Sequence, residues 1–342
     1  MKIAIFATTS WNLVNSRLGL ASALKKLGHD VILIAPEDEF TPLLLEKGFT
    51  WIDLPLNPRG KKIFSEIASI FRLIRIYRAE QFDLVNHFTP KGVIYGTIAA
   101  KLTHTHKIFN TITGLGFVFS GDAPKYLERL VSLLYKATLK KTKVIFQNPD
   151  NHRFFIENKF ITPDSGTLIL GSGIDMDQFK YTPEPVEKPP VVMLPSRFVA
   201  EKGVVTLVEA ARILNAENYP IRIVLVGRPE ENQPTSITEE ELHTWINQGI
   251  VEWWGWFNNM EDIYPRVNIV CLPTYYMEGI PKSLIEAAAS GRPIITTDVP
   301  GCRQITKQGE NGLLVPPRNP EALAKAIKQL GDDADLRTKM GK

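Results

Sequence analysis

Two glutamates separated by seven residues flank the start of a predicted helix. Glu278 lies in a loop after an apolar strand, and Glu286 lies about two turns into a helix predicted over residues 281–290. Pro281 suits the first helical position, where its missing amide hydrogen costs nothing, and Gly291 suits the left-handed end of a helix. Backbone amides at that N-terminus can bind an anion such as a phosphate. Carboxylates on either side of the phosphate could hold the hexose and ribose hydroxyls of a nucleotide sugar.

Two cations follow the strand predicted over residues 191–194. Arg197 offers a planar guanidinium, and Lys202, five residues later, offers a compact ammonium. Cations at the end of a strand can clamp a diphosphate and stabilise the charge left on a departing nucleotide. Solvated surface cations are the alternative interpretation. Gly227 ends another predicted strand, where glycine admits a ligand close to the backbone, although a plain turn explains it equally well.

Strand and helix patterns alternate along the chain, which predicts an α/β fold. The first repeat is strand 2–7, helix 17–27 and strand 31–35, which is the spacing of a βαβ unit. We therefore expect parallel sheets with helices on both faces. His87 ends a further predicted strand, where we expect a structural histidine with satisfied hydrogen bonds.

The pattern is interrupted by four prolines between residues 183 and 190 and then restarts. Such a segment is stiff and breaks a sheet. We expect an N-terminal domain over residues 1–175, a proline-rich hinge over residues 176–190 and a C-terminal domain over residues 191–342.

The two cysteines, Cys271 and Cys302, are too few for a disulfide framework. We expect both to be buried free thiols in a reducing compartment. The chain has no apolar run of about 20 residues and does not open with a signal segment. These features predict a cytoplasmic protein.

The segment around the two glutamates resembles a known family. Glu278-Gly279-Ile280-Pro281 through Glu286, followed by Ala-Ser-Gly-Arg-Pro-Ile-Ile, is similar to the Glu-x7-Glu region of retaining family 4 glycosyltransferases. That family, also called glycosyltransferase group 1, has the GT-B fold of two facing Rossmann-like domains. The resemblance covers nearly the whole chain and is strongest over residues 191–318. An ordinary βαβ unit with solvated glutamates is the alternative, because a bare Glu-x7-Glu occurs by chance in most proteins.

The resemblance implies a nucleotide-sugar site in the C-terminal Rossmann-like domain. Glu278, Arg197 and Lys202 would form the catalytic set, with the two cations replacing a metal ion on the donor diphosphate. Glu286 would hold the ribose and Phe257 would lie near the base, although the aromatic cluster around Phe257 can equally be core packing. The expected donor-binding residues are Gly227, Phe257, Gly279, Ile280, Pro281, Lys282, Ser283 and Glu286.

The N-terminal domain, the expected acceptor site, departs from the usual family pattern. Members usually carry a glycine pair after the first strand, whereas residues 8–17 read here as a polar loop. The segments Asn-Ser-Arg-Leu-Gly-Leu and Thr-Gly-Leu-Gly resemble a subgroup that transfers acetamido sugars to undecaprenyl-diphosphate-linked acceptors. The resemblance implies that Asn15, Arg17, Thr113 and Gly114 bind the acceptor.

The implied reaction is metal-independent, retaining transfer of a sugar from a UDP-sugar to a lipid-linked saccharide in surface glycan assembly. An N-acetylhexosamine is the expected sugar, with no cofactor or metal beyond the UDP-sugar as co-substrate. Asp175-Met176-Asp177 is expected to be a turn between the domains. A GT-B sugar-nucleotide epimerase and a non-catalytic sugar-nucleotide or glycan-binding protein are the alternatives. Family members usually continue with a helix that crosses back to the first domain, which we expect to be absent from a chain that stops at Lys342.

Basic residues are concentrated in the first half of the chain. Residues 1–170 hold 22 basic and 14 acidic side chains, a net charge of +8. Without a basic-aromatic motif, nucleic acid is not an expected partner. Apolar residues over 63–77 recur at helical spacing beside Arg72, Arg75 and Arg78, with lysines nearby at positions 61, 62, 136, 140, 141 and 143. A core-facing stripe is the alternative, but we expect peripheral contact with the anionic inner face of the plasma membrane.

Overall fold

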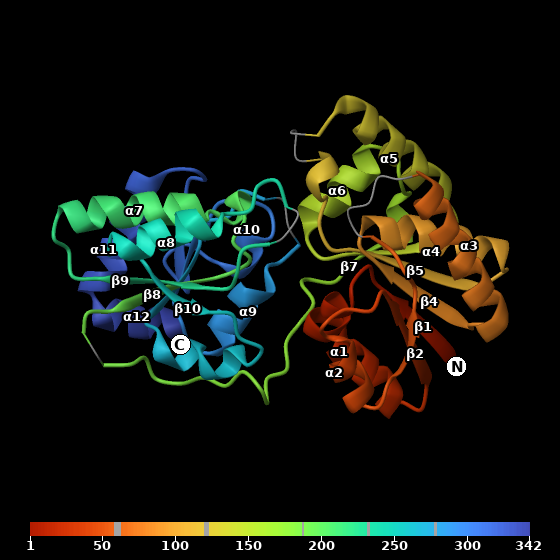
Figure 1. Cartoon of the computed structure of the whole chain (residues 1–342), viewed down its shortest axis with the longest axis horizontal. Coiled ribbons are helices and arrows are strands. Elements are labelled where there is room, and N and C mark those ends of the chain that lie inside the picture. The colour runs from red at the N-terminus through yellow and green to blue at the C-terminus, as the bar shows by residue number, and fades with distance from the viewer. Residues whose placement is uncertain (58–62, 120–122, 187, 231–232, 277–278) are drawn as a thin grey trace. The chain divides into compact units, whose positions relative to one another are not determined.

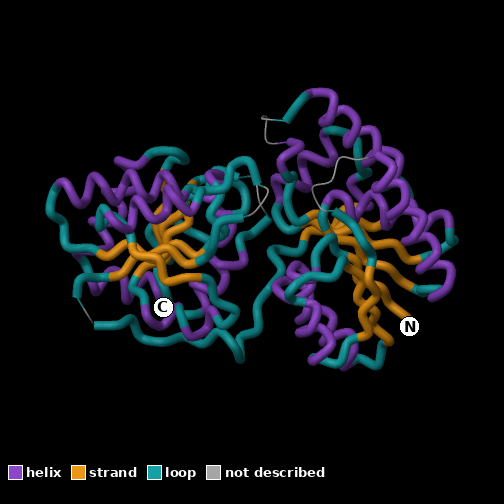
Figure 2. Tube along the Cα trace, in the orientation of Figure 1, coloured by secondary structure: helices purple, strands orange, loops and turns teal. Residues whose placement is uncertain are grey.

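The computed structural model describes residues 1–57, 63–119, 123–186, 188–230, 233–276 and 279–342 (Figure 1). The chain forms two compact units, Met1–Gly173 and Ile174–Lys342. Each unit contains one parallel sheet with helices on both faces (Figure 2). The predicted fold class, α/β with two Rossmann-like sheets, is confirmed.

The first unit contains a seven-stranded sheet in the order β3-β2-β1-β4-β5-β6-β7. All of its strand pairs are parallel. The strands are β1 (Lys2–Phe6), β2 (Asp30–Ala35), β3 (Thr50–Asp53), β4 (Leu84–Phe88), β5 (Lys107–Ile112), β6 (Lys143–Phe146) and β7 (Gly166–Leu168). The helices are α1 (Ser10–Lys26), α2 (Thr41–Glu46), α3 (Ile63–Glu80), α4 (Pro90–Leu102), α5 (Lys125–Thr138) and α6 (Pro149–Glu157).

Alternate residues of each strand face opposite helical layers. In β1, Ile5 packs in the cluster that contains Leu13 of α1, while Phe6 packs in the cluster that contains Leu73 and Tyr77 of α3. This is the pattern expected of a sheet that is buried on both faces. Helices α1 and α2 therefore cover one face, and α3, α4 and α5 cover the other.

The second unit contains a six-stranded parallel sheet in the order β10-β9-β8-β11-β12-β13. Helices α7, α8 and α11 pack on one face, and α9 and α10 pack on the other. The strands are β8 (Val191–Pro195), β9 (Arg222–Val226), β10 (Glu252–Gly255), β11 (Ile269–Leu272), β12 (Ile294–Thr297) and β13 (Gly312–Val315). The helices are α7 (Val204–Ala216), α8 (Glu239–Asn247), α9 (Lys282–Ala289), α10 (Cys302–Ile305), α11 (Pro320–Asp332) and α12 (Ala334–Gly341).

Strand order fixes where a ligand can bind in each unit. The chain leaves β1 towards β2 on one side, and β4 lies on the other side of β1. The same reversal occurs at β8, between β9 and β11. Loops at the carboxyl ends of the strands diverge at such switch points and leave a crevice there.

Helix α1 begins earlier than predicted. Its N-cap is Thr9, whose side-chain oxygen accepts a hydrogen bond of 3.1 Å from the amide of Asn12. The prediction of a polar loop before the helix was therefore wrong for residues 10–16. A threonine cap stabilises a helix start by about 1 kcal/mol. A helix can therefore begin at residue 10 even though its first two turns contain polar residues.

Residues 176–190, expected as a hinge, pack against the second unit. Phe179 is 3% exposed in its core. Arg292 donates hydrogen bonds to the side-chain oxygen of Thr182 at 2.6 Å and to the carbonyl of Pro183 at 3.0 Å. Glu184 pairs with Arg337 of α12 at 2.8 Å. The segment is therefore part of the second unit, whose last described helix, α12, helps to hold it.

Two predictions about buried side chains are confirmed. His87 is fully buried, with Nε2 3.0 Å from the hydroxyl of Tyr77 and Nδ1 2.8 Å from Oδ1 of Asn110. Cys271 and Cys302 are free and fully buried, and burial raises the pKa of the Cys271 thiol.

Candidate functional site

The candidate residues of the second unit lie in loops at the carboxyl ends of its strands. Arg197 and Lys202 lie in the loop after β8, and Gly227 follows β9. Phe257 follows β10, and Gly279 to Ser283 lead from β11 into α9. The strands β9, β8 and β11 are neighbours in the sheet, so their loops share one edge at the switch point.

Helix α9 presents an N-terminus without a side-chain cap. Pro281 is the N-cap, with φ −60° and ψ 122°, and the helix begins at Lys282, one residue later than predicted. Gly279, Ile280 and Pro281 are buried, and Lys282 and Ser283 are partly buried. A helix start of this kind leaves amide donors that suit a phosphate. Glu278, the predicted partner of the sugar hydroxyls, lies outside the described residues.

Glu286 lies on α9, and its carboxylate has two side-chain partners. It is 6% exposed, and its Oε2 accepts a hydrogen bond of 2.9 Å from the hydroxyl of Tyr264. Its Oε1 lies 2.9 Å from Nζ of Lys282. Burial, with the nearby carboxylate of Glu286, raises the pKa of Tyr264 well above its ordinary value, so this phenol remains a donor. A carboxylate has about four acceptor positions, so Glu286 keeps the capacity to accept a ligand hydroxyl.

Arg197 is paired with a carboxylate from the neighbouring loop. Its Nη1 bonds to Oε2 of Glu230, and its side chain is 46% exposed. Lys202 ends the short 3₁₀ helix η3 (Ala200–Lys202) and is partly buried. The ion pair holds one edge of the guanidinium fork, and the exposure leaves the fork accessible to a diphosphate.

Two glycines permit the close approach of these loops. Gly203 has φ +80°, and a Cβ there would lie 2.1 Å from the carbonyl oxygen of Pro273, at the end of β11. Gly227 has φ +142°, and a Cβ there would lie 1.9 Å from the carbonyl oxygen of Ser196. The amide of Gly227 donates to Gly255, and its carbonyl accepts from the Trp253 indole. Packing between loops thus explains Gly227 without a ligand.

Phe257 is partly buried and packs against the core of the second unit. Trp254 packs against the same core cluster as Phe257. Trp254 lies under Arg266 at 4.7 Å, and Trp256 lies under Arg228 at 4.9 Å. The predicted place of Phe257 beside the base stays a prediction.

The acceptor candidates of the first unit come from two elements. Asn15 and Arg17 lie on α1, while Thr113 and Gly114 follow β5. Thr113, Gly114 and Asn15 are partly exposed, whereas Arg17 is 6% exposed. Sequence reasoning missed Thr89, which follows β4 and has a φ of +69°, because backbone strain leaves no signal in composition or periodicity.

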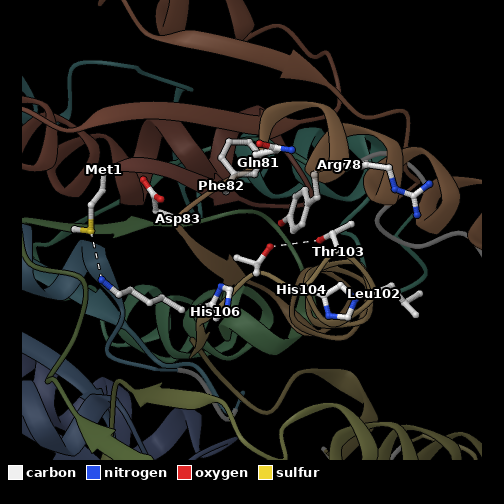
Figure 3. A pocket seen from close by; sticks show the side chains of 12 residues that line it. Met1, Arg78, Gln81, Phe82, Asp83, Leu102, Thr103, His104 and His106 are labelled. Atoms are coloured by element: carbon white, nitrogen blue, oxygen red, sulfur yellow. Dashed lines mark hydrogen bonds between the residues drawn. The ribbon is translucent and has the colours of Figure 1, made fainter.

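Two cavities in the first unit lie at the opposite, amino ends of the strands. One, of about 790 Å³, lies between the start of β5 and the segment before β4, with His104 and His106 on its wall (Figure 3). The other, of about 1370 Å³, lies at the start of β5 and β6. Neither is lined by the candidate residues, which lie in the first unit on α1 and after β5.

The described residues were also searched for metal-binding groups and for membrane-spanning helices. Those residues include no group of three or more His, Cys, Asp or Glu that could hold a metal ion. Asp175 accepts a hydrogen bond of 2.9 Å from the amide of Asp177, so the Asp-x-Asp segment forms a turn, as predicted. No helix of the described parts is both long enough and apolar enough to span a bilayer.

Each of the two Rossmann-like units matches a glycosyltransferase family. Residues 175–342 match the family described as glycosyl transferases group 1, and residues 2–148 match the family described as glycosyl transferase 4-like. The chain belongs to the group 1 glycosyltransferases (family 4), which have the GT-B fold and are retaining and metal-independent.

Individual relatives agree with this membership. The chain is 26% identical to N,N'-diacetylbacillosaminyl-diphospho-undecaprenol alpha-1,3-N-acetylgalactosaminyltransferase of Campylobacter jejuni, covering 100% of this chain and 92% of that protein. It is 26% identical to the capsular polysaccharide biosynthesis glycosyltransferase CapM of Staphylococcus aureus, covering 83% and 76%. Among solved structures, Anabaena Alr3699/HepE in complex with UDP and glucose matches with a TM-score of 0.82 at 18% identity, covering 100% and 93%.

Proposed function

We propose that this enzyme transfers an acetamido sugar from a UDP-sugar to a lipid-linked saccharide during surface glycan assembly. The observation that carries the proposal is the convergence of three features at one switch point. They are the Arg197–Lys202 loop, the N-terminus of α9 without a side-chain cap, and the buried carboxylate of Glu286. Cations, amides and a carboxylate are the groups that a diphosphate attached to a ribose requires.

Each element has a distinct task in this proposal. Arg197 and Lys202 stabilise the negative charge that develops on the departing diphosphate, which is the charge a metal ion would otherwise neutralise. The amides of α9 bind the same group, and Glu286 accepts from the ribose hydroxyls. Glu278 holds the hydroxyls of the transferred sugar. Binding energy from these contacts fixes the anomeric carbon for attack by the acceptor hydroxyl.

The choice of substrates is supported by the relatives. The Campylobacter jejuni enzyme carries in its name both an N-acetylgalactosaminyl group to transfer and an acceptor linked to undecaprenol through a diphosphate. The Anabaena structure was solved with UDP and glucose. On the acceptor side, Asn15, Arg17, Thr113 and Gly114 are the proposed contacts, since they lie on α1 and after β5 in the first unit.

A lipid-linked acceptor requires the enzyme to reach a membrane surface, and two helices support peripheral contact. On α3, Phe64 is 91% exposed and Phe71 is 62% exposed. On α5, Tyr126 is 73% exposed and Leu133 is 65% exposed. Both helices flank α4 on the same side of the sheet (Figure 1). Lys61 and Lys62, also predicted to contribute, lie outside the described residues.

Exposed lysines beside α5 add positive charge near the exposed apolar residues of that helix. Lys136, Lys140, Lys141, Lys143 and Lys159 are exposed and line the larger cavity together with apolar residues of β5 and Phe160. Among the described residues, no carboxylate forms an ion pair with any of them. Desolvation, with repulsion from Lys140 and Lys141, lowers the pKa of Lys101. We place the enzyme at the inner face of the plasma membrane on these grounds.

Calorimetric titration with UDP, GDP and ADP, with and without EDTA, tests the donor site first. Preference for UDP that EDTA does not change supports the proposal, whereas equal binding of all three nucleotides contradicts it. Transfer from UDP-acetamido sugars to an undecaprenyl-diphosphate-linked saccharide tests the reaction. Glu278→Ala is expected to abolish transfer while thermal unfolding stays cooperative. Unchanged turnover in this variant would remove Glu278 from the site.

Product analysis separates the remaining alternatives. An epimerase of this fold would convert the UDP-sugar into a second UDP-sugar without any acceptor. A non-catalytic binding protein would bind the nucleotide sugar and form no product. The relatives described above are glycosyltransferases, which favours a glycoside as the product.

A further inference from the structure

Arg17 is a buried cation to which the structure gives no ionic partner. It lies in the second turn of α1 and is 6% exposed. Its guanidinium carbon lies 4.0 Å from the centroid of the Phe88 ring. Within the described part of the chain it has no ion pair and no hydrogen bond, and its Nε is fully buried without a partner. Burial lowers the pKa of Arg17 to about 10.

Among the described residues, the other two buried arginines both have hydrogen-bond partners. Arg292 donates to Thr182, Pro183 and Val267. Arg337 donates to the carboxylate of Glu184 and to the carbonyls of Leu330 and Gly331. Burying a charge without such partners costs free energy that an aromatic contact only partly offsets. Leucine or methionine would stabilise the fold better at position 17, so the arginine points to an anionic ligand.

The surroundings of Arg17 belong to the ligand-binding edge of the first unit. Phe88, on which it stacks, is the last residue of β4, the strand across the switch point from β2. The next residue, Thr89, has φ +69° and ψ 154°, a conformation that β-branched residues rarely adopt. Its hydroxyl donates to that of Thr8, after β1, at 3.1 Å. Backbone strain of this kind is concentrated at ligand sites.

We propose that Arg17 binds a phosphate oxygen of the acceptor's diphosphate, with the Phe88 ring fixing the plane of the guanidinium. The proposal rests on the proposed function and identifies the group that the first unit recognises. A guanidinium suits this task because its parallel N–H donors match two phosphate oxygens. Asn12, on the same helix, has a buried Oδ1 without a partner, which is an acceptor for a hydroxyl.

Arg17→Met tests the assignment, because methionine fills the space without charge. Arg17→Lys retains the charge but not the fork. Arg153→Met is the matched control, since Arg153 is an exposed arginine on α6 of the same unit. Thermal unfolding of each protein is measured first. Inorganic pyrophosphate is then titrated calorimetrically into protein saturated with UDP, so that the donor site is already filled.

We expect Arg17→Met to unfold at or above the wild-type temperature and to lose pyrophosphate binding, while its affinity for UDP stays within about twofold of the wild type. Its KM for the lipid-linked acceptor should rise roughly tenfold or more, with a smaller rise for Arg17→Lys. The control should match the wild type. A lower unfolding temperature with unchanged pyrophosphate binding would make Arg17 structural. A loss of UDP affinity in Arg17→Met would mean that Arg17 binds a phosphate of the donor rather than of the acceptor. If the wild type binds pyrophosphate but transfers no sugar, the proposed function fails and the anion site stands.

Discussion

At the scale of single residues, Glu286 is the carboxylate that we propose to bind the ribose. Its two oxygens already have a phenol and an ammonium as partners, from Tyr264 and Lys282. These contacts fix its side-chain conformation, so binding does not have to order it. The cost is that any variant must preserve the hydrogen bond from Tyr264 to leave the fold undisturbed.

Glu286→Gln keeps the shape of the side chain and an oxygen for Tyr264 but removes the charge. We expect the affinity for UDP to fall about tenfold, because a hydrogen bond to a charged acceptor is replaced by a neutral one. Calorimetry with UDP measures the change. Glu252→Gln is the control, since Glu252 pairs with Arg222 at 2.7 Å, away from the carboxyl-end loops. Equal loss in both variants would refute the ribose role.

His87 makes the stability of the first unit depend on pH. Burial lowers the pKa of His87 from 6.5 to about 4, partly opposed by the hydrogen bond to Asn110. Between these values the unfolded chain binds the extra proton, so stability is full above pH 6.5 and falls as the pH drops towards 4. One such histidine accounts for a loss of roughly 2 kcal/mol between pH 7 and pH 5.

Chemical unfolding at pH 7 and pH 5 measures this loss, and His87→Gln is expected to show a correspondingly smaller one. NMR titration of the wild type gives a direct check, because the His87 ring should remain neutral at pH 5. A ring that titrates near pH 6.5 in the folded protein would contradict the expectation.

At the scale of elements, the loop after β8 depends on glycine at its point of contact with β11. Gly203→Ala combines a strained φ of +80° with a Cβ 2.1 Å from the carbonyl oxygen of Pro273. The loop that carries Arg197 and Lys202 must then move. We expect a loss of about 3 kcal/mol or more in unfolding free energy and roughly tenfold weaker UDP binding.

Gly249→Ala is the matched control for this substitution. Gly249 has φ +67°, also left-handed, but nothing lies within 4 Å of the added Cβ. Its cost should be only about 1 kcal/mol, with UDP affinity unchanged. Similar effects of the two substitutions on UDP binding would mean that backbone strain alone, rather than the contact with Pro273, explains the result for Gly203.

The elements were largely predictable, whereas their contacts were not. Short apolar runs that alternate with helical patterns predicted two parallel sheets, because a strand buried on both faces is a nearly continuous apolar run. The start of α1 was missed, since Asn12 and Asn15 resemble loop residues until Thr9 is recognised as a cap. The partner of Glu286, Tyr264, is 22 residues away and reaches it only through packing. The exposed stripe Tyr126, Leu130, Leu133 on α5 has helical spacing and could have been found.

At the scale of the whole molecule, the proposed membrane contact depends on the exposed lysines beside α5. Lys140→Glu with Lys141→Glu changes the formal net charge from +3 to −1, as does Lys26→Glu with Lys47→Glu at exposed positions elsewhere in the first unit. We expect only the first pair to abolish sedimentation with vesicles that contain phosphatidylglycerol, each lysine being worth about 1 kcal/mol at such a surface. Binding lost equally in both variants would indicate a general charge effect rather than a docking face.

The burial of both cysteines has a practical consequence. A buried thiol is inaccessible to maleimides, so the native chain should remain unlabelled while it is folded. A cysteine introduced on the surface of each unit would then carry a spectroscopic probe at a chosen position. The separation between two such probes would report, in real time, how the enzyme responds to its donor and to its acceptor.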